Sequence, residues 1–183
     1  MHVFLTGVSG VGKSTALDRT LSLLGLRPGG FRTGFTPDRK RLCLWPAWQA
    51  PDWSENSTVA RMERGRLIGD PAAFDRLGPA VLQACRPWAR LLVLDELGWL
   101  EQDAAAFRNA VWCSVRGEIP ILGVIKPIQN RAGTWLEELA QAPDGWVVTV
   151  GMTNRDALPG RLAAWLRSGS RYGEKTGEGW ERA

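Results

Sequence analysis

Short apolar stretches alternate with amphipathic segments along most of the chain. The stretches His2–Thr6, Arg90–Asp95, Pro120–Ile125 and Trp146–Val150 have the length and composition of buried strands. The first is followed by Lys13–Leu24, whose leucines recur at helical spacing on one face. Apolar strands that alternate with helices predict a parallel sheet covered by helices on both faces.

Four more helices are predicted from the spacing of apolar residues and from one capping signal. Asp70 followed by Pro71 is typical of a helix start, because the carboxylate caps free backbone N–H groups and proline fits the first turn. These helices are expected from Asp70 to about Cys85 and near Asp103–Val115, Thr134–Ala140 and Arg155–Arg167.

The segment 31–60 follows a different pattern. Phe31–Phe35 and Leu42–Trp45 resemble two strands joined through a turn at Pro37-Asp38, and residues 46–60 resemble a loop. We expect a small antiparallel extension over residues 31–50 beside the parallel sheet. The predicted fold class is therefore α/β, with three layers, a mainly parallel sheet and this extension.

Length and composition are those of one globular domain. The chain has 183 residues, of which 44% are hydrophobic and 23% charged, enough for one core. We expect this domain over residues 1–168 and a disordered tail, rich in glycine and balanced in charge, over 169–183. The longest apolar runs are too short to cross a membrane, and no signal peptide precedes the first strand. A cytoplasmic protein without membrane association is predicted.

The polar residues exclude several kinds of site. Three cysteines without a close pair fit neither a disulfide framework nor a zinc knuckle, and a single histidine argues against a Ser-His-Asp triad. The formal net charge of +4 is densest from Arg32 to Arg41. This charge suits a polyphosphate or a nucleic acid. No DNA- or RNA-binding motif accompanies it, so nucleic acid is not the expected partner.

The strongest motif is a phosphate-binding loop between the first strand and the first helix. It fits G-x-x-x-x-G-K-[ST] without a mismatch and comprises Gly7, Val8, Ser9, Gly10, Val11, Gly12, Lys13, Ser14 and Thr15. Glycines let backbone N–H groups point at phosphate oxygens, and the helix N-terminus adds partial positive charge. Lys13 is expected to reach the β- and γ-phosphates of a nucleoside triphosphate, and Ser14 to bind Mg²⁺. The alternative is a chance glycine-rich turn, which the lysine, the serine and both flanking elements argue against.

Two acids at the end of another buried strand supply the expected second half of the site. Asp95 emerges at the carboxyl end of its strand, where open α/β sheets bind ligands, and is expected to hold Mg²⁺ directly or through water. Glu96 is placed to polarise a water molecule for attack on the γ-phosphate. The alternative is a solvated strand end with two ordinary acids. Glu101 is interpreted as a surface acid rather than as a group that faces the site.

Residues near three other strand ends are weaker candidates. Asn154 and Arg155 follow the last strand and are expected to contact the nucleotide base, although Asn154 also fits an ordinary N-cap. Lys126 follows the strand Pro120–Ile125. Its position fits a lysine that contacts phosphate and, equally well, an ordinary solvent-exposed lysine. The arginines of the basic segment are candidates for a finger on the transferred phosphoryl group, namely Arg32, Arg39 and Arg41.

The order of these motifs resembles the THEP1-type nucleoside-triphosphatases, called cancer-related nucleoside-triphosphatases in animals. The resemblance rests on the N-terminal phosphate loop, Gly30-Phe31-Arg32-Thr33, the run from Val93 to Glu101 and Asn154-Arg155-Asp156, and covers about residues 1–167. It implies a small phosphate-loop protein that hydrolyses ATP, GTP and other triphosphates slowly with Mg²⁺. It also implies that Gly7–Thr15 bind phosphate and that Asp95 and Glu96 serve metal and water.

The chain departs from the family pattern at a few positions. Ser14 replaces a usual threonine with equivalent chemistry, Trp99 and Leu100 replace a usual lysine and methionine, and the tryptophan-rich region 40–70 matches weakly. We therefore predict a Mg²⁺-dependent nucleoside-triphosphatase with a three-layer phosphate-loop NTPase fold. Two alternatives stay open: a small-molecule or nucleotide kinase, and a nucleotide-gated assembly factor with a protein partner.

Overall fold

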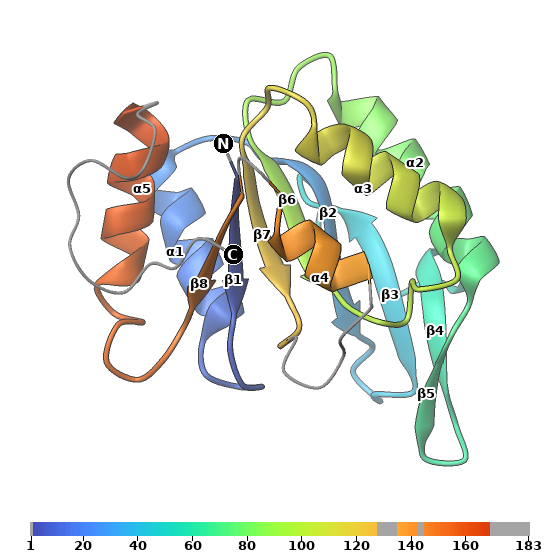
Figure 1. The fold of residues 1–183 in the computed structure, drawn as a ribbon. Helices are drawn as coiled ribbons and strands as arrows, with labels where there is room; N and C mark the ends of the chain where they lie inside the picture. Colours follow the sequence, from blue (N-terminus) through green and yellow to red (C-terminus); the bar gives the residue numbers. More distant parts are fainter. Residues whose placement is uncertain (1, 128–134, 143–144, 169–183) are drawn as a thin grey trace.

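The computed structural model describes residues 2–127, 135–142 and 145–168, and the predicted tail lies outside them (Figure 1).

The order of strands in the sheet differs from their order in the chain. Eight strands form one sheet in the order β5-β4-β3-β2-β6-β7-β1-β8. Their bounds are β1 His2–Thr6, β2 Gly29–Phe35, β3 Arg41–Pro46, β4 Thr58–Glu63, β5 Arg66–Gly69, β6 Leu92–Leu97, β7 Ile121–Ile125 and β8 Gly145–Thr149. The run β2-β6-β7-β1-β8 is parallel, as the sequence predicts.

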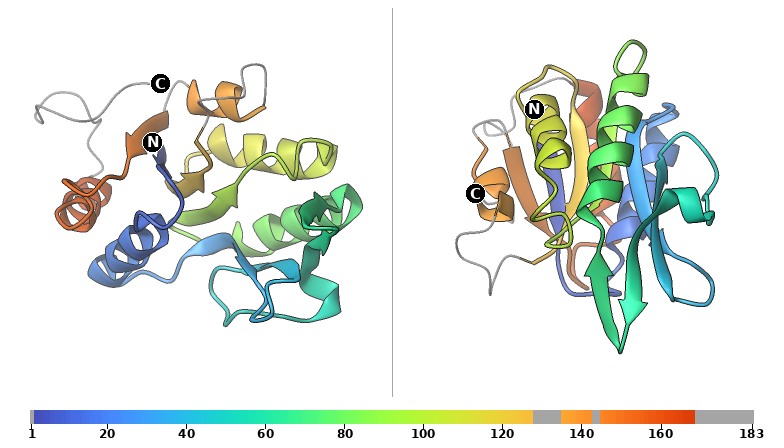
Figure 2. Two further views of the ribbon diagram at one scale, coloured as in Figure 1. Left: turned by 90° about the horizontal axis from the view of Figure 1, so that it is seen from below. Right: turned by 90° about the vertical axis from the view of Figure 1, so that its right-hand side faces the viewer.

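Helices cover both faces of this sheet. The helices are α1 Lys13–Leu24, α2 Pro71–Cys85, α3 Ala105–Val115, α4 Trp135–Ala140 and α5 Leu158–Ser168. Helices α1 and α5 pack on one face and α2, α3 and α4 on the other, which is visible when the molecule is viewed along the strands (Figure 2). This is the predicted three-layer α/β arrangement.

Both faces of the central strands are apolar, which explains why the strands show no polar alternation. In β6, Leu92 and Leu94 lie in the core under α2 and α3, whereas Val93 lies in the core under α1 and α5. In β1, Phe4 belongs to the first core and Leu5 to the second. Successive side chains of a strand point to opposite faces, so a strand that is covered twice must be apolar throughout.

The start of α2 and the end of α1 are determined by residues next to them in the chain, and the sequence predicts both correctly. The Asp70 carboxylate accepts a hydrogen bond from the Ala73 backbone N–H at 3.0 Å, and Pro71 opens α2. Helix α1 ends at Gly25, which adopts φ +64°, a left-handed conformation that glycine tolerates without a steric penalty. In both cases the residues that determine the boundary adjoin it in the chain.

The antiparallel extension is larger than the sequence predicts. The expected loop over residues 46–60 contains the short 3₁₀ helix Glu55–Ser57 and the start of β4, and β5 follows as an unpredicted strand. Strands β3, β4 and β5 pair antiparallel in succession, so the extension reaches Gly69 rather than residue 50. The pattern of β4 is hard to detect, because its first half is buried and its second half is exposed.

The last helix also begins later than predicted. Residues 152–157 form turns, and α5 begins at Leu158 rather than near Arg155. Of the predicted helix 134–140, residue 134 lies outside the described residues, and α4 begins at Trp135.

Among the helices that the structure describes, none is both long and apolar enough to cross a membrane.

Strands β2 and β6 approach each other closely at Gly30, next to the sheet edge where the predicted site residues lie. Gly30 in β2 adopts φ +85°, and a Cβ atom there would lie 2.0 Å from the Val93 carbonyl oxygen of β6. Glycine is therefore required for β2 and β6 to pair. The carboxyl ends of β1, β6, β7 and β8 then meet at one edge, the lower edge in Figure 1.

Candidate active site

The predicted phosphate loop leaves the carboxyl end of β1 and enters α1. All three of its glycines have positive φ: 140° at Gly7, 78° at Gly10 and 110° at Gly12. A Cβ atom on Gly7 would lie 2.7 Å from the Val150 carbonyl oxygen. All three glycines are therefore needed for the backbone conformation of the loop, and Gly7 is needed also for close packing against the residue that follows β8.

Lys13 folds back over the loop to which it belongs. Its Nζ donates hydrogen bonds to the carbonyl oxygens of Gly7 at 2.9 Å and Val8 at 3.2 Å, and the residue is 9% exposed. Ser14 and Thr15 are exposed at the first turn of α1. The ammonium group thus lies inside the loop, and the two hydroxyl residues lie at its open side.

Asp95 is a buried carboxylate at the carboxyl end of β6. It is 6% exposed, and among the described residues no hydrogen bond reaches its carboxylate. Its pKa is raised to about 6, mainly by burial and also by the Glu96 carboxylate, while the Arg32 guanidinium opposes this rise. A buried acid without a donor is costly to ionise, and a bound cation would remove that cost.

Glu96 lies at an irregularity in the sheet. The pairing of β6 with β7 shifts register between Asp95 and Leu97, and the peptide bond between Asp95 and Glu96 is cis. The Glu96 backbone N–H donates to the Thr33 hydroxyl of β2 at 3.2 Å. Glu96 is partly exposed, so the two adjacent acids occupy different environments. Sequence reasoning gave Thr33 no role, since a threonine in a strand carries no local signal of this contact.

Arg32 is the basic residue that the structure brings to the acids. It occupies the position of β2 that is paired with Asp95 in β6. Its guanidinium donates to the Asp18 carboxylate of α1 at 2.6 Å. Asp18 lies one helical turn after Ser14, and sequence reasoning missed it because a lone acid on an exposed helix face looks ordinary.

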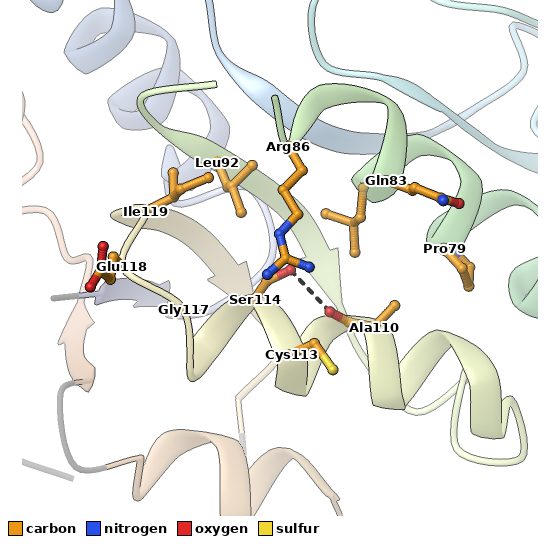
Figure 3. Close-up of a pocket in the computed structure, with 11 residues that line it drawn as sticks. Pro79, Gln83, Arg86, Leu92, Ala110, Cys113, Ser114, Gly117, Glu118 and Ile119 are labelled. Atoms are coloured by element: carbon orange, nitrogen blue, oxygen red, sulfur yellow. Dashed lines mark hydrogen bonds between the residues drawn. The ribbon is translucent and has the colours of Figure 1, made fainter. Parts of the chain in front are cut away.

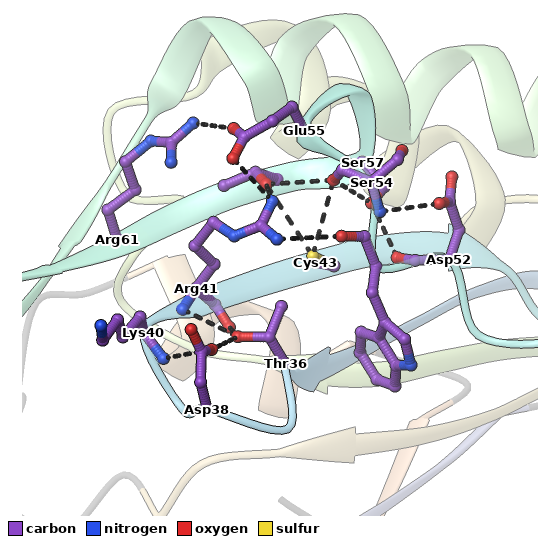
Figure 4. Close-up of polar contacts among 12 residues, drawn as sticks. Thr36, Asp38, Lys40, Arg41, Cys43, Asp52, Ser54, Glu55, Ser57 and Arg61 are labelled. Carbon is purple, nitrogen blue, oxygen red and sulfur yellow. Dashed lines mark hydrogen bonds and ion pairs between the residues drawn. The ribbon is translucent and has the colours of Figure 1, made fainter.

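Arg39 and Arg41, the other two predicted finger residues, have other surroundings. The Arg41 guanidinium donates to the Thr58 hydroxyl and the Trp53 carbonyl oxygen and pairs with Glu55 at 2.9 Å (Figure 4). These bonds connect β3 to the segment before β4, so Arg41 stabilises the extension, and its role as a finger stays a prediction. Arg39 stacks over the Phe35 ring at 5.5 Å.

The loop after β8 lies against the phosphate loop. The Arg155 side chain passes Gly12, because a Cβ atom on that glycine would lie 3.8 Å from the Arg155 Cδ. The Asn154 side chain accepts from the Gly151 N–H at 2.9 Å and donates to the Thr149 carbonyl oxygen at 2.8 Å. Asn154 therefore fixes its own loop and does not cap α5, while Arg155 lies at the predicted site.

Glu101 is buried, and its interpretation as a surface acid is wrong. It is 3% exposed, and its Oε1 accepts from the Gly98 N–H at 2.6 Å. Burial raises its pKa to about 7, and the Gly98 hydrogen bond and the Lys126 ammonium oppose this rise. Glu101, Glu96, Thr33 and Lys126 line a cavity of about 110 Å³ whose walls also contain leucines and phenylalanines.

A larger hollow lies at the other end of the sheet. It measures about 610 Å³ between α2 and α3, where Gln83 and Arg86 lie opposite Cys113 and Ser114 (Figure 3). Leu92, the first residue of β6, also lines it. This hollow is therefore at the amino ends of the strands, whereas the phosphate loop and the two acids lie at the carboxyl ends.

Comparison with known proteins agrees with this geometry. A sequence model of the family described as NTPase matches residues 2–163, which is most of the chain. The chain belongs to the NTPase family. Membership of the family makes it a nucleoside-triphosphatase, the activity that the phosphate loop predicts.

Similar NTPase sequences come from archaea and animals. The nucleoside-triphosphatase THEP1 of Thermofilum pendens is 27% identical over 180 residues, covering 91% of this chain and 96% of the relative. The cancer-related nucleoside-triphosphatase of Homo sapiens is 29% identical over 180 residues, covering 86% and 92%. A solved structure, THEP1 from Aquifex aeolicus, superposes with a TM-score of 0.74 over 91% of this chain and 99% of that one, at 19% identity. This structural likeness confirms the predicted fold.

Proposed function

We propose that this NTPase hydrolyses Mg²⁺-bound nucleoside triphosphates, ATP or GTP among them, to the nucleoside diphosphate and inorganic phosphate. The reaction would take place at the sheet edge where the phosphate loop and the carboxyl end of β6 lie. One observation carries the proposal. Asp95 is a buried carboxylate without a hydrogen-bond donor among the described residues, at the strand end where a phosphate-bound cation would lie.

The phosphates would bind to the backbone of Gly7–Thr15. Positive φ at the loop glycines turns N–H groups toward an anion, and the start of α1 contributes partial positive charge. Lys13 would exchange the carbonyl oxygens of Gly7 and Val8 for the β- and γ-phosphates. The exchange is favourable, because it replaces bonds from a charged donor to neutral carbonyl oxygens with bonds between two groups of opposite charge.

Ser14 and Asp95 are the residues that would hold Mg²⁺. Their oxygen atoms are of the kind that this cation prefers, and it commonly binds through only one or two carboxylates together with phosphates and water. This suits the chain, because no group of three His, Cys, Asp or Glu side chains in the described part of it forms a metal site alone. When bound, the cation would neutralise charge that develops on the phosphate oxygens.

Glu96 would orient the attacking water and accept its proton. The water oxygen forms a bond to the γ-phosphorus while the bond from that phosphorus to the bridging β-phosphate oxygen breaks. The nucleoside diphosphate leaves with the bridging oxygen, and the γ-phosphoryl group becomes inorganic phosphate. Arg32 would add positive charge beside these groups, since it lies at the position paired with Asp95. Arg155 would contact the nucleotide base, and Asn154 would hold the loop that presents it.

The cavity beside Glu96 favours one second candidate function. A kinase needs a site for a phosphoryl acceptor next to its general base, and the cavity of about 110 Å³ that Glu96 lines is large enough for a small alcohol. Incubation with labelled ATP and a panel of small alcohols separates the functions. Phosphate release that is independent of any acceptor supports hydrolysis, whereas a phosphate ester supports the kinase.

The proposed mechanism is tested by Glu96→Gln. Glutamine keeps the size of the side chain but cannot accept a proton at neutral pH, and general-base catalysis contributes roughly 10²- to 10⁴-fold to a rate. We expect Mg²⁺-ATP affinity close to that of the parent and single-turnover hydrolysis at least about 100-fold slower. Glu63→Gln, at the exposed end of β4, is the matched control. A rate within a few-fold of the parent would remove Glu96 from the chemistry.

The cellular setting also belongs to this proposal. We propose a cytoplasmic enzyme whose functional unit is residues 1–168, with a nucleoside triphosphate as its main partner and nucleic acid not required. The extent of the functional unit is supported by the described site residues, which lie between residues 7 and 155. A protein partner is the remaining proposal, and pull-down with and without nucleotide tests it.

A further inference from the structure

Lys126 carries a positive charge beside the site, and the mechanism above does not use it. It follows β7, which lies between β6, the strand of Asp95 and Glu96, and β1, the strand that leads to the phosphate loop. Its backbone N–H donates to the Leu97 carbonyl oxygen at 2.9 Å. The residue is therefore fixed at the same sheet edge as both halves of the site.

The side chain of Lys126 is held by an aromatic ring rather than by a carboxylate. Its Nζ lies 3.9 Å from the centroid of the Trp99 ring. Its methylene groups run along Gly98, where a Cβ atom would come within 3.2 Å of the Lys126 Cδ. Within the described residues it makes no salt bridge, although it lines the same cavity as Glu96 and Glu101.

We propose that Lys126 is a further catalytic residue, which leaves the Trp99 ring and binds the γ-phosphate when a nucleoside triphosphate occupies the site. The proposal rests on the proposed function, because it requires the triphosphate to lie between the phosphate loop and Glu96. Trp99 then acts as the resting position of the ammonium group, and the cavity beside Glu96 gives the side chain room to turn.

The strengths of the two interactions favour the movement. A cation–π contact at an exposed ring is weak, and Trp99 is 39% exposed. A charge-assisted hydrogen bond to a phosphate oxygen is stronger, particularly where protein walls exclude water. Glu101 lies close enough to lower the cost of an ammonium group in the cavity, and its own pKa is lowered by Lys126 in return. The ammonium group would therefore move from the ring to the triphosphate.

Gly98, which the Lys126 side chain contacts, makes hydrogen bonds through both its backbone N–H and its carbonyl oxygen. The Gly98 N–H donates to Glu101, and the Gly98 carbonyl oxygen accepts from the Trp135 indole N–H at 3.0 Å. This turn keeps Trp99 and the lysine stem in place while only the end of the lysine needs to move. The movement is therefore a change of side-chain rotamer and requires no change in the sheet.

Lys126→Met tests the catalytic role, because methionine keeps an unbranched apolar stem and removes the charge. We expect kcat to fall about 10- to 100-fold, as for loss of one charged hydrogen bond. The affinity for nucleoside diphosphate should stay unchanged, because that ligand has no γ-phosphate. Lys40→Met, an exposed lysine in the β2–β3 turn, is the control and should hydrolyse at the parental rate.

Fluorescence tests the movement separately. The emission of Trp99 is obtained as the difference between the parent and Trp99→Phe, so that the other nine tryptophans cancel. This difference should change on addition of a non-hydrolysable Mg²⁺-triphosphate analogue, stay constant with diphosphate, and not respond in Lys126→Met. Equal responses to the two nucleotides, or Lys126→Met with parental kcat, would overturn the proposal. If Glu96→Gln is inactive while Lys126→Met is normal, only the role of Lys126 fails.

Discussion

Arg32 and Asp95 occupy paired positions on the adjacent parallel strands β2 and β6. Desolvation raises the pKa of the buried Asp95 carboxyl to about 6, even though the guanidinium opposes this rise, and the guanidinium also binds Asp18 of α1 at 2.6 Å. One arginine thus connects the acid at the end of β6 to the helix that begins in the phosphate loop. The connection explains how two halves of the site, far apart in the chain, are held at one place.

Asp95→Asn should weaken the site and stabilise the protein without ligand. The folded state holds Asp95 at a pKa of about 6, above its ordinary value of 3.8, so its ionised form costs stability as pH rises through that interval. Asparagine removes this cost, and we expect about 1–3 kcal/mol of added stability at pH 8 and little change near pH 4. Mg²⁺-ATP affinity should fall at least about tenfold, because a metal ligand is lost.

Calorimetric titration and urea unfolding measure both effects on the same samples. Unchanged Mg²⁺-ATP affinity would contradict a role of Asp95 in metal binding. Asp103→Asn, outside the site, serves as the control for the loss of one negative charge.

Lys13→Ala should abolish hydrolysis at a small cost in stability. The ammonium group donates to two carbonyl oxygens of its own loop, and loss of such bonds costs about 1–2 kcal/mol in total. Turnover should fall by at least about 100-fold, because the charge that faces the β- and γ-phosphates is gone. Phosphate release and thermal unfolding are measured together. A variant that unfolds at nearly the parental temperature and still hydrolyses ATP would argue against the phosphate-loop mechanism.

Glu101→Gln should change how stability depends on pH. Burial raises the pKa of Glu101 from 4.5 to about 7, so the parent loses stability as pH rises across this window. Glutamine keeps an oxygen that accepts from the Gly98 N–H and does not ionise. The two proteins should be similarly stable near pH 4, and the variant more stable by up to about 3 kcal/mol at pH 8. Urea unfolding across this pH range measures the difference, and parallel pH curves would show that Glu101 does not titrate in this window.

Gly30→Ala should prevent stable folding, whereas Gly160→Ala should leave the fold intact. A Cβ atom on Gly30 would lie 2.0 Å from the Val93 carbonyl oxygen, and φ there is +85°. At Gly160 in α5, a Cβ atom would have no neighbour within 4 Å, and alanine in an exposed helix is favoured over glycine by about 1 kcal/mol. Circular dichroism and thermal unfolding compare the pair. Native-like stability of Gly30→Ala would mean that β2 and β6 can separate without loss of the sheet.

Several parts of the site depend only on residues that are neighbours in the chain, and these could be predicted from the sequence. The phosphate loop, helix α1 from Lys13 to Leu24 and the Asp70 cap of α2 were predicted with the bounds that the structure has. Asp95 at the end of a buried strand was predicted as well. Each of these features arises from backbone geometry, capping or side-chain spacing within a few residues, so local sequence is sufficient to define it.

Which charged residues belong to the site depends instead on how distant elements pack together. Arg32 and Arg41 look alike in the sequence, but strand pairing places the first beside Asp95, while the second is bonded to Trp53 and Thr58. Glu101 looked exposed, yet it is enclosed by residues from β2, β3, β5, α2 and the end of β7. Burial of a charge depends on the elements that pack around it, and these come from distant parts of the chain. Local sequence patterns do not specify such packing, because it results from the order of strands in the sheet.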